Sequence, residues 1–395
     1  MDDMPIQPEE DPGPSYTREK SLEIEVGSSE PESDSDSSSD GEESIKSTRS
    51  YPPQNLAYVE ENGRRYCDEK YFMPNDESEL TRLNIVHQIY LILLEGRLTL
   101  VPFMTDSPRI LDIGTGPGDW AIEMSAQYPN ATIIASDLGI FDSGVAHVSL
   151  PNVDFQLADA QSQWTYHEPF DLIHIRGLSG AFRDWHAVYQ QALAHLKPGG
   201  YIEIADTDPA GDTITLTLDP ENEHNNDEGE GDGAEDKNQD EDEDGDAKTP
   251  SLKTYASALR ASGEISGRPR DLRHLRKEAL LAAGFSDINV LEHTFPVGLW
   301  PEDTGEKTLG KMALIVLLEG LEAHALRPLT SFAGYTLEAV RELCEKVRGE
   351  VLGAAKITAR VRFVTARKPA SFARRREEIL ARALARAREL SGDMG

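Results

Sequence analysis

The sequence has few of the residues that stabilise secreted or metal-binding proteins. Its only cysteines, Cys67 and Cys344, are far apart and lack metal-ligand spacing, so we expect neither a disulfide framework nor a metal site. Long apolar runs are also missing. The longest, 312–318, is far too short for a membrane span, and the acidic N-terminus does not look like a secretory signal. We therefore predict a soluble protein of a reducing compartment, cytoplasmic or nuclear, with no membrane partner.

Basic residues are outnumbered, with 39 Lys and Arg against 71 Asp and Glu and a net charge of −32. Much of the excess lies in two segments: residues 1–50 carry 15 acidic and 4 basic residues, and residues 219–246 carry 15 acidic residues and one Lys. Segments so poor in apolar side chains cannot offset the entropy lost on folding, so we expect residues 1–55 and 216–250 to be disordered. The acidic charge also argues against nucleic-acid binding, because phosphates would be repelled.

The C-terminal segment 370–395 is a local exception to this acidity. It contains a cluster of arginines in a helix-prone context, which is either a nuclear-import patch or a solvated helix face. Residues 56–369 are then the part of the chain that we expect to fold as one catalytic domain, interrupted by the acidic insertion.

Within this domain, short apolar runs alternate with amphipathic stretches. The apolar runs predict strands at 109–113, 132–137, 153–157, 170–175, 201–205, 288–293 and 357–365, with a sharp turn at 197–200. The amphipathic stretches predict helices at 79–96, 119–128, 185–196, 251–262, 271–283, 309–326 and 337–347. Such alternation is typical of an α/β fold with a doubly wound, mostly parallel sheet. The last strand alternates with a period of two, which suits an antiparallel strand at the sheet edge.

The first predicted strand leads into a glycine-rich turn, Gly114-Thr-Gly-Pro-Gly118. Glycines allow a tight reversal and a close approach of ligand to backbone at the carboxyl end of a strand, where sheets of this kind bind ligands. In a dinucleotide-binding fingerprint another glycine would occupy position 119. This chain has Asp119 there, and its carboxylate would compete with a pyrophosphate for the amides at the helix start. The turn therefore favours a cofactor without phosphate over NAD, and argues against a nicotinamide-dependent oxidoreductase.

Three aspartates at strand ends complete a candidate nucleoside site. Asp112 could accept a hydrogen bond from the ammonium group of an adenosylmethionine tail, or could cap the loop amides as a buried carboxylate. Asp137 follows Gly116 by 21 residues, a separation that suits a carboxylate binding both ribose hydroxyls, with a helix cap as the alternative. Asp159-Ala160 would lie over the adenine and accept its amino group, unless Asp159 is an ordinary turn residue.

Several motifs follow one another between about residues 66 and 369. They include Asp112-Ile-Gly-Thr-Gly-Pro-Gly-Asp-Trp120, Ser136-Asp-Leu138, Asp159-Ala160, Phe170-Asp-Leu-Ile-His-Ile-Arg176, Leu178-Ser-Gly180, Leu196-Lys-Pro-Gly-Gly200 and Gly298-Leu-Trp-Pro301. Together they resemble the fungal LaeA-type (UMTA-like) methyltransferases. The turn departs from its relatives at Pro117, which removes an amide donor.

The resemblance implies a class I, Rossmann-like methyltransferase fold with a seven-stranded sheet, binding S-adenosyl-L-methionine, in a family associated with fungal secondary metabolism. The predicted cofactor-binding residues are Asp112, Gly114, Thr115, Gly116, Gly118, Asp137, Leu138, Asp159, Ala160 and Arg176. Arg176 could instead hold an acceptor carboxylate or pair with a structural acid. His174 is interpreted as a structural histidine facing the helix layer, and Tyr71-Phe72 and Trp185 as core or lid residues. No general base is assigned.

Two functions remain open at this point. Some members of the family act on small metabolites, and we predict methyl transfer from S-adenosylmethionine to a small metabolite or natural-product intermediate. Other members resemble regulators that work in nuclear complexes. The alternative is therefore a regulatory protein that acts through protein partners and has little or no small-molecule activity.

Overall fold

A computed structural model describes residues 58–68, 71–139, 141, 150–207, 214–217, 251–354 and 356–370. These residues belong to one compact unit, Ser47–Gly395. The predicted segment 1–55 lies outside the described residues, as do all but two residues of the predicted insertion 216–250 and all but one of the predicted tail 370–395.

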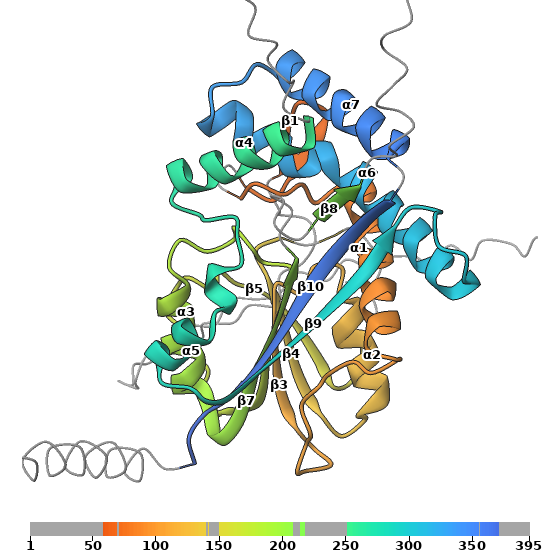
Figure 1. Ribbon diagram of the computed structural model, residues 1–395. Helices are drawn as coiled ribbons and strands as arrows, with labels where there is room; N and C mark the ends of the chain where they lie inside the picture. The colour runs from red at the N-terminus through yellow and green to blue at the C-terminus, as the bar shows by residue number, and fades with distance from the viewer. Residues whose placement is uncertain are drawn as a thin grey trace, which may run out of the picture. The chain divides into compact units, whose positions relative to one another are not determined.

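The centre of the fold is an eight-stranded sheet with the order β5-β4-β3-β6-β7-β10-β8, in which β9 also pairs with β10 (Figure 1). Its strands are β3 (Arg109–Ile113), β4 (Thr132–Asp137), β5 (Val153–Leu157), β6 (Phe170–Arg176), β7 (Leu196–Thr207), β8 (Ile214–Thr217), β9 (Ser286–Val297) and β10 (Lys356–Arg367). Strands β3 to β7 run parallel, whereas β10 is antiparallel to its neighbours β7, β8 and β9. The predicted mostly parallel sheet with an antiparallel last strand is confirmed, and the short strand β8 adds to the seven predicted strands.

Helices cover both faces of the sheet. They are α1 (Glu77–Leu93), α2 (Asp119–Gln127), α3 (Trp185–His195), α4 (Ser251–Ser266), α5 (Lys277–Ala283), α6 (Thr304–Phe332) and α7 (Leu337–Gly353). Side chains of a strand alternate between faces, so neighbouring residues of β3 serve different cores. Ile110 packs with Trp120 and Met124 of α2, and Leu111 packs with Val188 of α3 on the other face.

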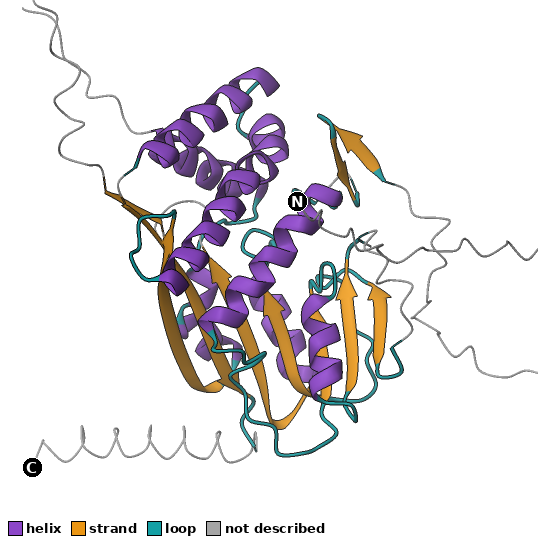
Figure 2. Ribbon diagram, turned by 90° about the vertical axis from the view of Figure 1, so that its right-hand side faces the viewer, coloured by secondary structure: helices purple, strands orange, loops and turns teal. Residues whose placement is uncertain are grey.

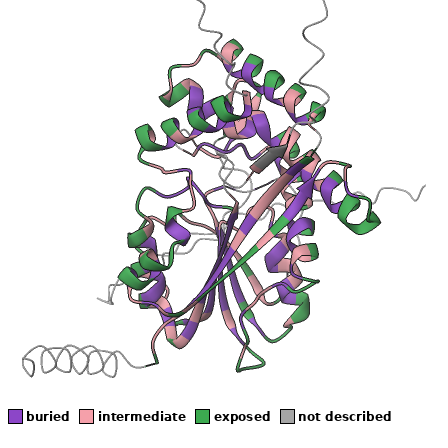
Figure 3. Cartoon of the chain, viewed as in Figure 1, coloured by how far each residue is buried: buried purple, intermediate pink, exposed green. Residues whose placement is uncertain are grey.

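A third core lies beyond the carboxyl ends of the parallel strands (Figure 1, Figure 2). Here α4, α6 and α7 form a helical cap, in which Tyr255, Leu321 and Val347 are buried together with Phe363 of β10. Buried residues run along the sheet and the inner sides of these helices, while their outer sides are exposed (Figure 3). The cap therefore closes over the sheet edge at which the glycine-rich turn lies.

The segment before α1 is held by charged contacts. An antiparallel hairpin, β1 (Val59–Glu61) and β2 (Arg64–Tyr66), precedes α1 and was not predicted from the sequence. Asp76 caps α1 by accepting from the Glu79 amide (3.0 Å), and the same carboxylate binds the Arg64 guanidinium over 2.5 and 2.9 Å. One aspartate thus starts the helix and fixes the hairpin against it.

Two predicted segments differ in extent from the observed elements. The predicted helix 271–283 is divided into a 3-10 helix, η4 (Arg273–Leu275), and α5. The reversal expected at 197–200 is present as a register shift in the β6–β7 pairing, where Gly199 has a φ of 83°. The predicted turn at 197–200 lies inside β7, because its backbone pairs with the chain after β10: the Gly199 amide donates to the Lys368 carbonyl (2.9 Å) and the Lys368 amide donates to the Gly200 carbonyl (2.8 Å). A partner so far along the chain leaves no trace in the local sequence.

Candidate active site

The glycine-rich turn lies between β3 and α2. The amides of Gly114 and Thr115 both donate to the Ser136 carbonyl on β4, over 2.8 and 3.1 Å. Gly114 has a φ of 70°, and a Cβ there would lie 2.7 Å from the Leu178 side chain. The left-handed backbone and the close approach of Leu178 both require glycine at this position.

Gly118, at the end of the turn, has a packing role. Its φ is 93°, and a Cβ there would lie 2.8 Å from the Phe155 ring of β5. It immediately precedes α2, so the absence of a side chain lets the helix begin close to the sheet.

Asp137 ends β4 opposite the turn. Its carboxylate accepts hydrogen bonds from the amides of Gly116 (2.8 Å) and Gly139 (3.1 Å). Burial raises the pKa of this carboxyl, and the hydrogen bonds from Gly139 and Gly116 oppose that shift. The two amides hold the side chain in one orientation.

A pocket opens at the carboxyl ends of β3 and β4. Five of the predicted cofactor-binding residues line it: Gly114, Asp137, Leu138, Asp159 and Ala160. Its walls are completed by Tyr71, Leu178, Ala181 and Phe182 among others. The last three follow β6 directly, so the rule that ligands bind at strand ends could have identified them. Tyr71 comes from the segment before α1, and the sequence indicates it only as a core or lid residue.

Asp112 lies beneath the turn, in register with His174 on the neighbouring strand β6. Its Oδ1 is 2.7 Å from His174 Nδ1, and the imidazole stacks on the Trp120 ring with centroids 3.8 Å apart. The other carboxylate oxygen, Oδ2, is buried and has no hydrogen-bond partner among the described residues, and the same holds for Thr115 Oγ1. Within the part of the chain that the structure describes, these two buried polar atoms at the turn therefore have no hydrogen-bond partner.

The structure does not bring Arg176 into this pocket. Arg176 and His174 are two residues apart on β6, so their side chains share a face of the sheet. The Arg176 guanidinium lies 3.1 Å from His87 Nδ1 and 4.9 Å from the centre of the Tyr90 ring, both on α1. Its contacts are thus with the helix layer.

A second histidine–carboxylate pair lies at the end of β7 and was missed from the sequence. His274 Nε2 is 2.9 Å from Asp206 Oδ2, and Asp206 Oδ1 accepts from the Ser179 amide over 3.2 Å. Both side chains are about 1% exposed, and the Trp185 ring stacks on the imidazole at 4.0 Å. This pair fixes η4 and the segment after β6 to the sheet.

The segment after β6 also borders a second cavity. Leu178 lines the pocket at the ends of β3 and β4, whereas its neighbours Gly177 and Ser179 line a larger, mainly apolar cavity beneath the cap. Leu83 of α1 connects the two regions, because it lines this cavity and its Cδ1 would lie 3.7 Å from a Cβ at Gly116. The cavity is therefore next to the glycine-rich turn.

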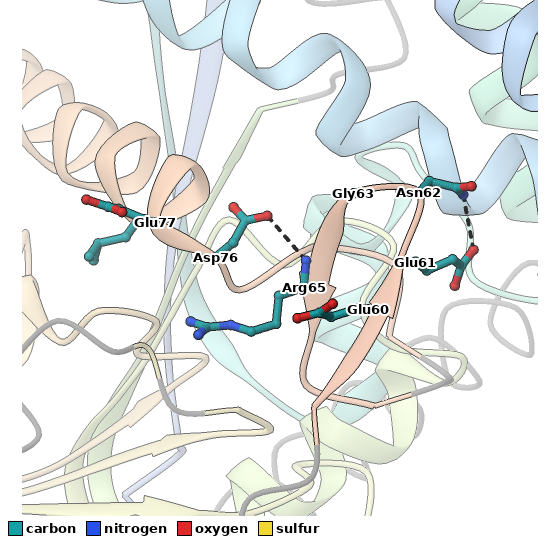
Figure 4. A pocket seen from close by; sticks show the side chains of 8 residues that line it. Glu60, Glu61, Asn62, Gly63, Arg65, Asp76 and Glu77 are labelled. Atoms are coloured by element: carbon teal, nitrogen blue, oxygen red, sulfur yellow. Dashed lines mark hydrogen bonds between the residues drawn. The ribbon is translucent and has the colours of Figure 1, made fainter.

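A hollow beside the hairpin is lined by residues that hold the hairpin to neighbouring helices (Figure 4). Carboxylates dominate its lining, from Glu60, Glu61, Asp76 and Glu77. Asp76 is held by Arg64 and by the Arg65 amide (3.4 Å), and Glu61 lies 2.9 Å from Arg327 Nη2 on α6. Two of these acids thus connect the hairpin to α1 and α6.

Sequence comparisons with known proteins show the family to which this chain belongs. A family profile described as "Methyltransferase domain" matches residues 85–263. The secondary metabolism regulator LAE1 of Cochliobolus heterostrophus is 33% identical over 333 residues, which are 80% of this chain and 97% of that protein. The methyltransferase pytC of Aspergillus terreus is 31% identical over 299 residues, 75% of this chain and 83% of the relative. The chain belongs to the LaeA-type family of class I S-adenosylmethionine-dependent methyltransferases. A solved structure, phosphoethanolamine N-methyltransferase 2 of Haemonchus contortus with S-adenosyl-L-methionine, is 19% identical with a TM-score of 0.39 and covers 72% of this chain and 52% of that chain.

No described helix is both long and apolar enough to cross a membrane. In the same part of the chain, no group of three or more His, Cys, Asp and Glu side chains is arranged to hold a metal ion.

Proposed function

We propose that the pocket at the ends of β3 and β4 binds S-adenosylmethionine and that this LaeA-type methyltransferase acts on a small molecule, a metabolite or natural-product intermediate of fungal secondary metabolism. When bound, the cofactor supplies a methyl group on an activated sulfonium. The chain's own contribution is then to bind, orient and exclude water, because alignment of the reacting atoms supplies much of the rate of such a transfer.

The observation that carries the proposal is the lining of the pocket, where Gly114, Asp137, Leu138, Asp159 and Ala160 come together. Asp112 and Thr115 at the adjoining turn do not line it, but their buried Oδ2 and Oγ1 atoms have no partner among the described residues. Leaving a buried polar group without a hydrogen bond costs about 1–3 kcal/mol, so such atoms in a native site usually belong to a ligand or a water molecule. A cofactor with an ammonium group offers the kind of donor that Asp112 Oδ2 lacks.

The aspartates that line the pocket can accept further hydrogen bonds, as binding of a nucleoside requires. An ionised carboxylate accepts about four hydrogen bonds, and the two amides that bind Asp137 leave room for the ribose hydroxyls. Asp159 is exposed at the pocket, and its Oδ1 accepts from the Gln161 amide over 2.8 Å. Its Oδ2 is then the acceptor that we assign to the adenine amino group, with Ala160 and Leu138 as neighbours of the base and ribose.

Isothermal titration calorimetry tests the cofactor assignment. We expect the full chain to bind S-adenosylmethionine and S-adenosylhomocysteine, and NAD to bind far more weakly. Binding of NAD in preference to both sulfur nucleosides would refute the proposal. Incubation with methyl-labelled S-adenosylmethionine and a fungal metabolite extract should then yield a labelled small molecule.

A second candidate function is favoured by the relatives themselves. LAE1 of Cochliobolus heterostrophus, of which this chain covers 97%, is named a secondary metabolism regulator. Under this alternative the protein binds the cofactor but acts through protein partners, in the nucleus or in the cytoplasm. Labelled protein in place of a labelled metabolite, in an extract that contains both, would support the regulatory role, and microscopy of a fluorescent fusion would give the compartment.

A further inference from the structure

The cavity bordered by Gly177 and Ser179 has the make-up of a small-molecule site. Apolar side chains from α1, α6, β9 and β10 supply most of its lining, among them Val86, Phe295, Leu317 and Val361. Ligand sites are typically apolar with a few polar groups that fix orientation. Asp206 also lines the cavity, but it already accepts from Ser179 and pairs with His274. Other polar groups of the lining must therefore determine which ligand the cavity binds.

Two nitrogen-bearing side chains flank one gap in that wall, Arg82 from α1 and His324 from α6. Both line the cavity. Gly320 lies between them: a Cβ there would be 3.4 Å from His324 Cδ2 and 3.7 Å from Arg82 Cδ. Because residue 320 is a glycine, the space between the two side chains stays open.

Arg270 determines which nitrogen of His324 carries the proton. Arg270 Nη1 donates to the His324 carbonyl (2.7 Å), and its Nη2 lies 2.9 Å from His324 Nδ1. A guanidinium has only donors, so Nδ1 must accept and the ring proton must lie on Nε2. Burial, together with the charges of Arg82 and Arg270, lowers the pKa of His324 well below its usual value, which keeps the ring neutral. His324 is thus a neutral donor through Nε2.

Arg82 is held in a similar way. Its Nε and Nη2 bind the Glu79 carboxylate in a fork, over 2.8 and 2.6 Å, which fixes the guanidinium plane and balances its charge. Its third nitrogen, Nη1, and His324 Nε2 have no hydrogen-bond partner among the described residues. This part of the wall therefore presents two hydrogen-bond donors, Arg82 Nη1 and His324 Nε2.

We propose that this cavity is the methyl-acceptor site, and that the acceptor is an apolar molecule with a hydrogen-bond-accepting oxygen that binds Arg82 Nη1 and His324 Nε2. The proposal rests on the proposed function, because it assigns the cavity to the acceptor. A pure hydrocarbon would leave both donors unsatisfied, and a cationic amine would face the Arg82 guanidinium and could not accept from either donor. A carbonyl, phenolate or carboxylate oxygen meets both requirements.

A pair of fluorescent probes tests this chemistry without knowledge of the natural acceptor. 1-Anilinonaphthalene-8-sulfonate has an apolar ring system with anionic oxygens, and N-phenyl-1-naphthylamine has the same rings without them. We expect the wild-type chain to bind the sulfonate more tightly. His324→Phe, which keeps an aromatic ring but removes the Nε2 donor, should weaken sulfonate binding by on the order of tenfold and leave the neutral probe unchanged. His324→Gln, whose amide can donate from a similar position, should keep most of the preference.

Steric variants identify the cavity as the place where the probes bind. Leu317→Trp, which fills the cavity from α6, should weaken both probes, whereas Ile315→Trp on the exposed side of the same helix should weaken neither. Equal affinity of the two probes, or an unchanged preference in folded His324→Phe, would overturn the inference. Calorimetry with S-adenosylmethionine on the same variants separates the two proposals: absent cofactor binding would refute the proposed function, while the probe results still decide the chemistry of the cavity.

Discussion

The pocket to which we assign the cofactor and the apolar cavity beneath the cap are neighbours but are built in different ways. The pocket takes most of its lining from the carboxyl ends of consecutive strands, residues 113–182, with Tyr71 added. The cavity takes its lining from α1, α4, α6 and four strands, over residues 82–361. The pocket needs particular residue types, glycine at a left-handed turn and aspartate at a strand end. Most of the cavity needs only apolar side chains of suitable size, which many sequences would supply, and its specific polar groups, Arg82 and His324, come from separate helices.

The largest expected effect is on stability, in a variant of the buried His274–Asp206 pair that lies between the two sites. His274→Leu removes one partner of a pair that is about 1% exposed and leaves the Asp206 carboxylate buried and uncompensated. Breaking a buried pair in this way typically costs about 3–5 kcal/mol. We expect the free energy of unfolding, measured by urea denaturation, to fall by that amount. The control is His186→Leu on the exposed surface of α3, with a change within about 0.5 kcal/mol. A loss under about 1 kcal/mol would show that the pair does not stabilise the folded chain.

On the cofactor side, Asp137→Ala should weaken S-adenosylmethionine binding by about 1–3 kcal/mol, because the ribose hydroxyls lose their acceptor. Titration calorimetry measures the change. Asp154→Ala, an exposed aspartate on β5, is the matched control and should leave the affinity as it is. An unchanged affinity in Asp137→Ala would show that the ribose assignment is wrong. Probe binding in the apolar cavity should not respond to either variant.

On the cavity side, His324 should make stability depend on pH. Its pKa in the folded chain is lowered by burial and by Arg82 and Arg270, so the unfolded chain takes up the proton first as the pH falls below about 6.5. The contribution is complete above that pH and is lost below it, with a slope of at most about 1.4 kcal/mol per pH unit. The difference in unfolding free energy between pH 7.5 and 5.5 should be smaller in His324→Phe. Identical pH profiles in the two proteins would contradict this.

The smallest effect lies in the cap, away from both sites. Gly349 on α7 is exposed, and a Cβ there would meet nothing within 4 Å. Gly349→Ala should therefore stabilise the protein by about 0.5–1 kcal/mol, since alanine loses less conformational freedom in a helix. Thermal unfolding measures the gain. Cofactor and probe affinities should both stay constant, and a loss of probe binding would mean that the cap transmits changes to the cavity.

Sequence reasoning succeeded where local signals and structure coincide. The predicted strands 109–113, 132–137 and 153–157 have the bounds of β3, β4 and β5. The first two are buried parallel strands, which are short apolar runs, whereas β5 lies at the sheet edge and is only partly buried. It went astray where the direction of a side chain mattered. Side chains alternate between the two faces of the sheet along β6, so Arg176 must lie on the same face as His174. The structure has Arg176 on that face, against α1 and away from the pocket.

The glycine-rich turn and the aspartates at strand ends are motifs of only a few residues each. The sequence alone was therefore enough to predict the turn, the strands around it and the family. Which donors face the apolar cavity was decided only by tertiary structure. Arg82, Arg270 and His324 come from three distant segments, and the proton position on His324 depends on Arg270, 54 residues away. Such a contact has no local signature, because packing between helices and strands brings the groups together.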